Sequence, residues 1–453
     1  MNFSRIAITL IMAAAAYANE SGPEPRSTGA PGDKTPLACA QAGCHSANRQ
    51  TGGPVNPAGG SVNAVFSTGD VYYTGVPVLI TVSVSDPVNR RYGFQMTARL
   101  ASNLANGQAG AFTSVSPDTI VICEDGRTKR TTCPANAPVE FIEQSRAATG
   151  AWQFTWTPTD GQTGPVRFYV AGNAVNFNGS EDGGDRVYTR EFVLNPAACA
   201  QAQPTVTSVK SGTDFGGFAN ITAGTWVEVK GTNLATATRI WEARDFLGTQ
   251  APSNLDGVRV HVNGKSAPVY FVSPGQINVQ APADTQTGQV FLSVTNCQGT
   301  TSQFSVTKAL IVPGVLAPAG FNIGGKQYLV AQFQDQTFVG RTDLFPPSAG
   351  VKTRPAKPGD LLTVYGIGFG DVNPTQTPGV VVGQLNTIVA PVVVSFGTRQ
   401  ADLSYRGLAP NFVGLYQFNM TVPPDVPDGD QQINITVAGT PLAQPAMFLT
   451  IQR

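Results

Sequence analysis

A short segment with two cysteines and a histidine is the part of this sequence that could do redox chemistry. Four residues separate Cys39 from Cys44, and His45 follows directly. Two thiols beside a histidine suit a covalently attached c-type haem, which needs two thioether bonds and an axial ligand. The usual spacing is two residues, so the longer spacing weakens this pattern. The same thiols could instead form a disulfide that closes a small loop, with His45 as a surface residue.

The rest of the sequence provides little for the distal side of a haem. The second of the two histidines, His261, alternates with Arg259 on the outer face of an expected strand. Met96 is a conceivable substitute as axial ligand. No further Cys/His pair with zinc-ligand spacing lies nearby, so zinc is not expected. We therefore favour a Cys39–Cys44 disulfide and keep haem as the alternative, with other pairings or another metal as the remaining options.

A glycine-rich segment gathers side chains whose oxygen atoms calcium prefers as ligands. Its spacing matches no EF-hand, so the favoured interpretation is a solvated turn, with calcium as the weaker possibility. The candidate ligands are Asn176, Asn178, Glu181, Asp182 and Asp185.

The other four cysteines are expected to form the disulfides Cys123–Cys133 and Cys199–Cys297. The first pair brackets the basic stretch 127–130, which could bind a sulfated glycan but is better explained as a solvated hairpin tip. No nucleophile-elbow pattern accompanies either histidine, so a Ser-His-Asp hydrolase is not expected.

The first residues have the pattern of an export signal. Arg5 gives a positive start, residues 6–16 form an apolar stretch, and Ala16-Tyr17-Ala18 is a small-x-small cleavage site before Asn19. The apolar run is too short to span a bilayer, and no other stretch approaches the necessary length. We expect a secreted or cell-envelope protein with residues 1–18 as its signal peptide, in a compartment that permits disulfides.

The composition indicates several β domains. The chain has 453 residues, more than one hydrophobic core usually supports. Charged residues make up 13%, while 49 glycines and 34 prolines suit short strands joined by tight turns. Lys+Arg and Asp+Glu balance at 29 each, so nucleic acid is not an expected partner.

Alternating apolar residues predict strands between about residues 65 and 194. Val78, Ile80, Val82 and Val84 would share one face of a strand, and 152–156 would place three aromatic side chains on one face. Before them, residues 19–36 are rich in Gly, Pro and Ser and are expected to form a flexible tether. A further boundary is expected at 195–204. The first β-sandwich would therefore occupy residues 37–200.

An internal repeat organises the remainder of the chain. Residues 223–231 return as 358–366, each with a glycine turn that begins a strand and a glycine at its end. Residues 276–282 return as 417–423. The repeat predicts two tandem sandwiches at 204–310 and 311–453, which gives an all-β chain of three immunoglobulin-like β-sandwiches.

The C-terminal 250 residues resemble an uncharacterised C-terminal domain that recurs in secreted proteins of Solibacter-like acidobacteria. The matching segments are 260–264, 270–278, 407–410 and 414–417. The individual units of that family look like the immunoglobulin-like IPT/TIG type. The resemblance implies an architecture and no activity.

The N-terminal region resembles bacterial relatives of the reelin-type (Reeler) domain over about residues 27–194. The matching segments are 27–33, 44–46, 92–96, 152–158 and 172–174. The resemblance implies a β-sandwich related to immunoglobulin folds. Those relatives often carry the two-residue cysteine spacing of a haem site. They tend to place a histidine before the tryptophan strand, where this chain has Glu143-Gln144.

Two functions follow from these observations. The favoured one is an exported, non-catalytic surface or matrix protein that binds an extracellular protein or a glycan. The alternative is an extracellular or periplasmic electron-transfer protein with one c-type haem at Cys39, Cys44 and His45.

Overall fold

The structure is a computed structural model that divides the chain into two compact units, residues 1–197 and 198–453. It describes residues 22–34, 38–40, 45, 54–146, 149–159, 162–176, 184–199 and 202–453. The predicted signal peptide lies outside the described residues. None of the helices among them is long and apolar enough to cross a membrane.

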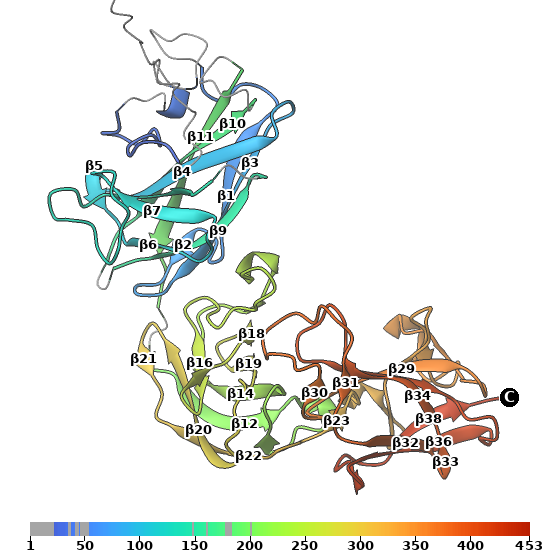
Figure 1. Ribbon diagram of the computed structural model, residues 1–453. Coiled ribbons are helices and arrows are strands. Elements are labelled where there is room, and N and C mark those ends of the chain that lie inside the picture. Colours follow the sequence, from blue (N-terminus) through green and yellow to red (C-terminus); the bar gives the residue numbers. More distant parts are fainter. Residues whose placement is uncertain are drawn as a thin grey trace, which may run out of the picture. The chain divides into compact units, whose positions relative to one another are not determined.

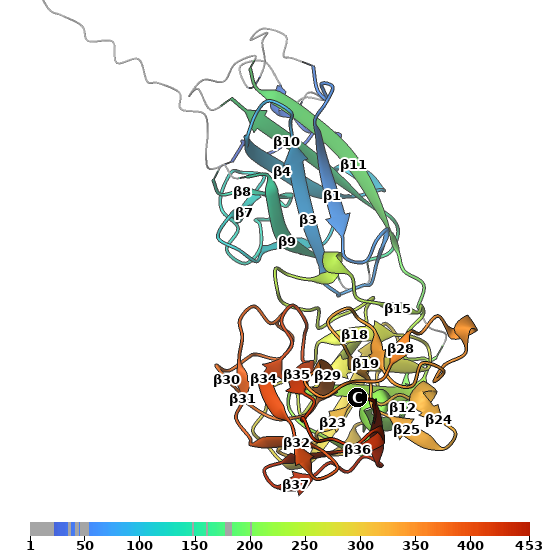
Figure 2. The ribbon, with the colours of Figure 1, turned by 90° about the vertical axis from the view of Figure 1, so that its right-hand side faces the viewer.

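The N-terminal unit is a sandwich of a four-stranded sheet, ordered β1-β3-β9-β6, and a seven-stranded sheet, ordered β2-β11-β10-β4-β8-β7 with β5 beside β4. Figures 1 and 2 show these strands in blue to green. The elements are η1 (Ala38–Ala40), β1 (Ser61–Phe66), β2 (Val71–Tyr72), β3 (Val78–Ser85), β4 (Arg91–Leu100), β5 (Asn103–Gln108), β6 (Ala111–Ser114), β7 (Thr119–Cys123), β8 (Glu140–Gln144), β9 (Ala151–Thr157), β10 (Val166–Val175) and β11 (Arg186–Pro196).

The core of this unit lies between the two sheets and follows the expected alternation. Val78, Ile80, Val82 and Val84 are all buried on β3. On the neighbouring strand β9, Trp152, Phe154 and Trp156 are buried on the same side, as their period-two spacing requires. The aromatic strand is therefore a core strand.

The expected flexible tether is wrong for residues 22–34. Ser27, Thr28 and Ala30 are buried, and the segment packs on the N-terminal sandwich. Gly32 has φ +81, and a Cβ atom there would lie 2.8 Å from the Cβ of Ala105. The glycine and proline content that suggested a linker instead permits tight turns and a close approach to β5.

The first sandwich of the C-terminal unit combines a five-stranded sheet, ordered β12-β14-β19-β18-β15, with a six-stranded sheet, ordered β13-β22-β20-β16-β17 with β21 beside β20. The elements are β12 (Thr205–Ser211), η2 (Thr213–Phe215), β13 (Asn220–Ile221), β14 (Trp226–Thr232), β15 (Arg239–Ile240), η3 (Ala243–Asp245), β16 (Arg259–Val262), β17 (Lys265–Ser266), β18 (Val269–Val272), β19 (Gln276–Gln280), β20 (Gly288–Asn296), β21 (Gly299–Thr300) and β22 (Phe304–Lys308).

The second sandwich of this unit has two seven-stranded sheets, ordered β28-β27-β26-β29-β35-β34 with β23 beside β29, and β24-β25-β38-β36-β32-β33 with β37 beside β36. A separate pair joins β30 to β31. The elements are β23 (Gly314–Val315), η4 (Ala319–Phe321), β24 (Asn322–Ile323), β25 (Lys326–Tyr328), β26 (Ala331–Gln332), β27 (Phe338–Val339), η5 (Pro347–Ala349), β28 (Thr353–Arg354), β29 (Leu361–Ile367), β30 (Val372–Asn373), β31 (Thr387–Ile388), β32 (Val392–Phe396), β33 (Arg399–Gln400), β34 (Asp402–Leu408), β35 (Tyr416–Thr421), β36 (Gly429–Val437), β37 (Thr440–Pro441) and β38 (Met447–Ile451).

The internal repeat is confirmed down to the strand register. In the first sandwich β14 pairs antiparallel with β19, and Trp226 faces Gln280. In the second, β29 pairs antiparallel with β35, and Leu361 faces Thr421, which are the repeat-equivalent residues. The all-β fold of tandem immunoglobulin-like sandwiches is therefore confirmed.

Candidate functional site

The structure brings together residues from two separate sequence candidates. The Nδ1 atom of His45 lies 2.6 Å from Oδ2 of Asp185, whose side chain is 1% exposed. The other oxygen, Oδ1, accepts the backbone N–H of Asn176 at 3.0 Å. The backbone N–H of His45 donates to the carbonyl of Cys39 at 3.2 Å. Asp185 thus fixes the imidazole ring through Nδ1, as carboxylates do for histidines that act as ligands.

The weak calcium candidate gains no support from this geometry. Both carboxylate oxygens of Asp185 already accept hydrogen bonds from His45 and Asn176. The other three candidate ligands, Asn178, Glu181 and Asp182, lie outside the described residues. Within the described part of the chain, no group of three or more acidic, histidine or cysteine side chains could hold a metal ion.

The described residues do not fit a covalently attached haem. Cys39 is 6% exposed and packs with Ala171 and Val187, which leaves no open side for a macrocycle. Its Sγ atom lies 3.6 Å from the carbonyl of Ser27. Met96 pairs with Val170 and belongs to the core between the sheets, whereas Ala171, one position further along the strand, packs against η1 on the opposite face. Met96 therefore cannot ligate iron held by His45. Cys44 lies outside the described residues.

We expect natively exported protein to be colourless, with a peptide that links Cys39 to Cys44. The enclosed position of Cys39 suits a small structural loop better than a porphyrin edge. Absorbance spectroscopy and non-reducing peptide mapping test this expectation. A Soret band that survives denaturation, and that is lost in a Cys44→Ala variant, would contradict it.

The other predicted cysteine pairs are present in the structure. Cys123 is bonded to Cys133, with the Cα atoms 5.5 Å apart, and Cys199 is bonded to Cys297, with the Cα atoms 5.8 Å apart. Within the basic stretch between Cys123 and Cys133, Lys129 turns inward and contacts a carboxylate oxygen of Glu140 at 2.8 Å. Lys129 is therefore not available to a sulfated glycan, whereas Arg127 and Arg130 are exposed.

His261 lies where the sequence predicts it, on the outer face of β16. Its neighbours Val260 and Val262 are buried on the other face. Its Nε2 atom lies 3.2 Å from the hydroxyl of Ser266 on the paired strand β17. His261 is therefore a surface residue that contacts the neighbouring strand.

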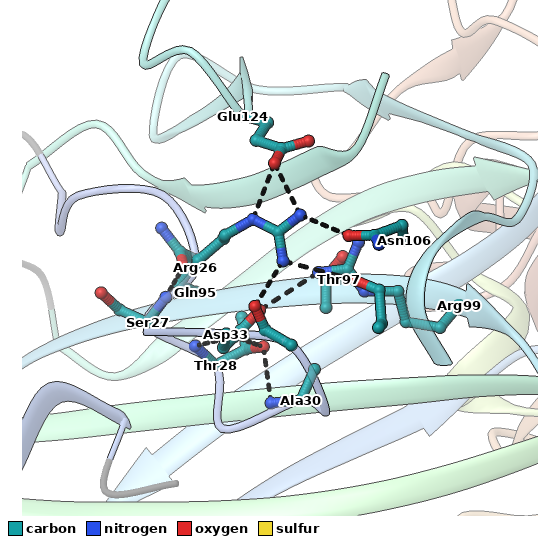
Figure 3. A network of polar contacts seen from close by, with 12 residues as sticks. Arg26, Ser27, Thr28, Ala30, Asp33, Gln95, Thr97, Arg99, Asn106 and Glu124 are labelled. Carbon is teal, nitrogen blue, oxygen red and sulfur yellow. Dashed lines mark hydrogen bonds and ion pairs between the residues drawn. The ribbon is translucent and has the colours of Figure 1, made fainter. Parts of the chain in front are cut away.

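A polar network that the sequence did not reveal holds residues 22–34 on the sandwich (Figure 3). The guanidinium of Arg26 donates from Nε and Nη2 to Glu124 at 2.9 and 2.6 Å. It also donates to Asn106 at 2.9 Å and to the carbonyl of Gly32 at 2.6 Å. The backbone N–H of Ser27 donates to the side chain of Gln95 at 2.9 Å. One arginine thereby connects the segment to β5 and to the end of β7.

The centre of this network is a fully buried ion pair between Arg99 and Asp33. Nη2 of Arg99 donates to Oδ1 of Asp33 at 3.2 Å, and both side chains are 0% exposed. Thr28 donates to the second oxygen, Oδ2, from its backbone N–H at 3.0 Å and from its hydroxyl at 2.7 Å. The guanidinium also lies over the ring of Phe141 at 5.3 Å, while Nε and Nη1 have no hydrogen-bond partner. Burial lowers the pKa of Arg99 to about 10, although Asp33 opposes this shift.

A second buried acid lies beneath the start of the segment. Glu143 on β8 is 3% exposed and accepts a hydrogen bond from Nε2 of Gln95 at 2.8 Å. Gly22 approaches so closely that a Cβ atom there would lie 2.3 Å from Oε1 of Glu143. Burial raises the pKa of Glu143 to about 8, and the hydrogen bond from Gln95 offsets only part of this shift.

We expect the N-terminal unit to lose stability as the pH rises from about 5 to about 8, by an amount on the order of a few kcal/mol. The folded protein keeps the proton of Glu143 to about pH 8, whereas the unfolded chain releases it near the ordinary pKa of 4.5. The contribution of this proton is therefore complete below the unfolded pKa and lost as the pH passes the folded pKa. Glu143→Gln should flatten this dependence, as measured by urea unfolding at several pH values.

A surface carboxylate provides the control for this prediction. Glu191 is 39% exposed and pairs with Arg167, so Glu191→Gln should keep the pH dependence of the wild type. An unchanged slope in Glu143→Gln would show that this carboxyl does not titrate as proposed.

Comparison with known proteins gives one family match. The model of the IPT/TIG domain family matches residues 204–308. No curated protein matches the sequence.

Solved structures with similarity include three β proteins. The human F-spondin reeler domain is 18% identical, with a TM-score of 0.21, and the match covers 31% of this chain and 92% of that chain. A cohesin module of a Clostridium perfringens family 33 glycoside hydrolase is 8% identical, with a TM-score of 0.20 and coverage of 31% and 100%. The titin domains I67–I69 are 11% identical, with a TM-score of 0.15 and coverage of 86% and 98%. By the family match, residues 204–308 are similar to IPT/TIG domains.

Proposed function

We propose that this chain is an exported, non-catalytic binding or structural protein of the cell surface or extracellular matrix. The observation that carries this proposal is the joint between its two C-terminal sandwiches. A fixed joint lets tandem sandwiches act as a rigid support that presents loops to a partner. The IPT/TIG match of residues 204–308 supports the same type of function.

The joint is held by buried hydrogen bonds and not by an open linker. The side chain of Gln280 is 2% exposed and donates to the carbonyl of Gly224 at 2.8 Å. Its Oε1 accepts the backbone N–H of Gly379, in the second sandwich, at 2.5 Å. The carbonyl of Gly379 accepts the N–H of Ala251 at 2.7 Å. A Cβ atom at Gly414 would lie 2.0 Å from Nε2 of Gln280, so this position needs glycine.

The two disulfides and the immunoglobulin-like fold fit an extracellular protein, because such bonds persist mainly in oxidising compartments. The polar network around Arg99 supports a structural role for residues 22–34. Its charges lie between that segment and the outer face of the seven-stranded sheet, where they hold the segment in place.

We expect the mature protein to begin at Asn19, since Ala16 and Ala18 provide small side chains for signal peptidase. The intact mass of protein recovered from outside producing cells should correspond to residues 19–453. Protease added to whole cells should remove the cell-associated fraction. An Ala18→Leu variant, with a large side chain at the cleavage site, should keep its leader. Recovered wild-type protein that still contains residues 1–18, or that stays protease-resistant inside the cell, would contradict the proposal.

A further inference from the structure

Four aromatic side chains cluster at one end of the five-stranded sheet of the first C-terminal sandwich. Trp241 lies 5.6 Å from Trp226, 5.1 Å from Tyr270 and 5.0 Å from Phe246, measured between ring centroids. Trp226 and Tyr270 are also 5.6 Å apart. We call these four residues the aromatic cluster. All four keep partial exposure to solvent, in contrast to the fully buried aromatic residues of the N-terminal core.

The backbone of the sheet fixes the positions of these rings. Trp226 begins β14, and Tyr270 lies at the bulge of β18, where the pairing with β19 shifts register. The backbone N–H of Trp241 donates to the carbonyl of Tyr270 at 2.8 Å. Rings fixed in this way lose little conformational entropy on binding, which favours affinity.

Ion pairs stabilise the loop that carries Trp241 and Phe246, which leaves the sheet beyond β15 and is yellow-green in Figure 1. Arg239 contacts Asp245 at 2.8 Å and Asp256 at 2.7 Å. Glu242 and Arg244 form a second pair at 3.2 Å. The charges of this loop are therefore paired with one another.

The surface continues onto the second sandwich. The indole N–H of Trp226 donates to the carbonyl of Val413 at 3.1 Å, which ties the loop of Phe412 to the aromatic cluster. Phe412 is 51% exposed, and Ile240, beside Trp241, is 48% exposed. Exposed apolar side chains that gather in one patch, unlike singly exposed ones, mark binding surfaces.

Two polar groups of the aromatic cluster remain available to a ligand. Among the described residues, neither the hydroxyl of Tyr270 nor the indole N–H of Trp241 has a hydrogen-bond partner. Partly exposed rings with free polar edges suit a ligand that has both apolar C–H faces and hydroxyl groups. A sugar ring has both. The paired charges nearby favour a neutral sugar over an acidic one.

We propose that the aromatic cluster is a binding platform for a neutral polysaccharide. This proposal rests on the proposed binding function and names its ligand class. The apolar C–H face of a pyranose would pack on the ring of Trp241, with the ring of Tyr270, inclined by 77° to it, beside the sugar, and the Tyr270 hydroxyl and Trp241 N–H would reach its hydroxyl groups. The indole N–H of Trp226 is already bonded to the carbonyl of Val413, so the Trp226 ring holds the other rings in place.

Affinity electrophoresis of the full mature chain tests the platform. Neutral xyloglucan, hydroxyethylcellulose and galactomannan, included in native gels, should retard the wild type, while alginate, an acidic polysaccharide, should retard it less. Trp241→Ala should lower the affinity at least tenfold, and Trp241→Phe, which keeps a ring, should lower it less. Phe291 is 45% exposed on the other sheet of the same sandwich, so Phe291→Ala should bind like the wild type.

Tryptophan fluorescence gives a second readout. Trp152 and Trp156 are buried in the N-terminal core, so a change on adding polysaccharide reports on Trp226 and Trp241. Circular dichroism and thermal unfolding confirm that each variant is folded.

If no neutral polymer retards the wild type, or if a folded Trp241→Ala binds equally well, the platform is wrong. If neutral polymers retard the Trp241→Ala and Phe291→Ala variants equally, the polymer binds elsewhere on the chain, and the broader binding function is left intact. A protein on the cell surface that captures the chain through Trp241, with no polysaccharide binding, would replace the proposed ligand.

Discussion

Asp33→Ala is expected to lower the free energy of unfolding of the N-terminal unit by about 3–5 kcal/mol, because it leaves a buried guanidinium without its counter-charge. Arg99 has 0% of its side chain exposed and no hydrogen-bond partner for Nε or Nη1. The substitution also removes the acceptor of two hydrogen bonds from Thr28. Urea unfolding would measure the loss, followed by the fluorescence of Trp152 and Trp156 in a chain whose other two tryptophans are replaced by phenylalanine.

Two matched variants test whether the loss of stability comes from an unpaired buried charge or from the removal of any charged side chain. The surface pair Arg146–Asp118 has side chains 71% and 40% exposed, so Asp118→Ala should cost less than about 1 kcal/mol. Adding Arg99→Met to Asp33→Ala removes the unpaired cation and should restore most of the lost stability. If Asp33→Ala alone is as mild as Asp118→Ala, the pair is not the anchor of residues 22–34.

The β architecture could be predicted because alternating apolar side chains and turn glycines are local signals. Val78 to Val84 and Trp152 to Trp156 show period-two alternation directly in the sequence. The repeat predicted that β14 and β29 are equivalent strands, and the register of their partners agrees. Each strand is recognised from residues that are neighbours along the chain, and the repeat from two such segments compared with each other.

The network under residues 22–34 was not predicted because its partners are far apart in the sequence. Gln95, Thr97 and Arg99 alternate with apolar residues on β4, which is also the pattern of a strand with one solvated face. Nothing local shows that Asp33 covers that face. The only signal was indirect, since both segments contribute motifs to the Reeler resemblance. A sequence shows that a charged residue is buried only when the residue that pairs with it is known.

At the candidate site near Cys39, the sequence singled out His45 and the acidic segment near Asp185 by residue type alone. It did not show that Asp185 would contact His45, or that Met96 would face the core. The first depends on how two distant loops meet. The second follows from the alternation of side chains along β4, where every second residue faces the core. This alternation could have been counted once the strand was predicted.

Removing the Cys199–Cys297 disulfide is expected to lower the free energy of unfolding of the C-terminal unit by about 4–5 kcal/mol, whereas removing Cys123–Cys133 should cost the N-terminal unit about 2–3 kcal/mol. The two bonds close loops with sequence separations of 98 and 10 residues. A longer closed loop removes more conformations from the unfolded chain, and the loop from Cys199 to Cys297 contains β12 to β20. The variants Cys199→Ser/Cys297→Ser and Cys123→Ser/Cys133→Ser avoid an unpaired thiol, and urea unfolding under oxidising conditions compares them. A smaller loss for the long loop than for the short one would mean that native-state contacts, and not the restricted unfolded chain, determine what these bonds contribute.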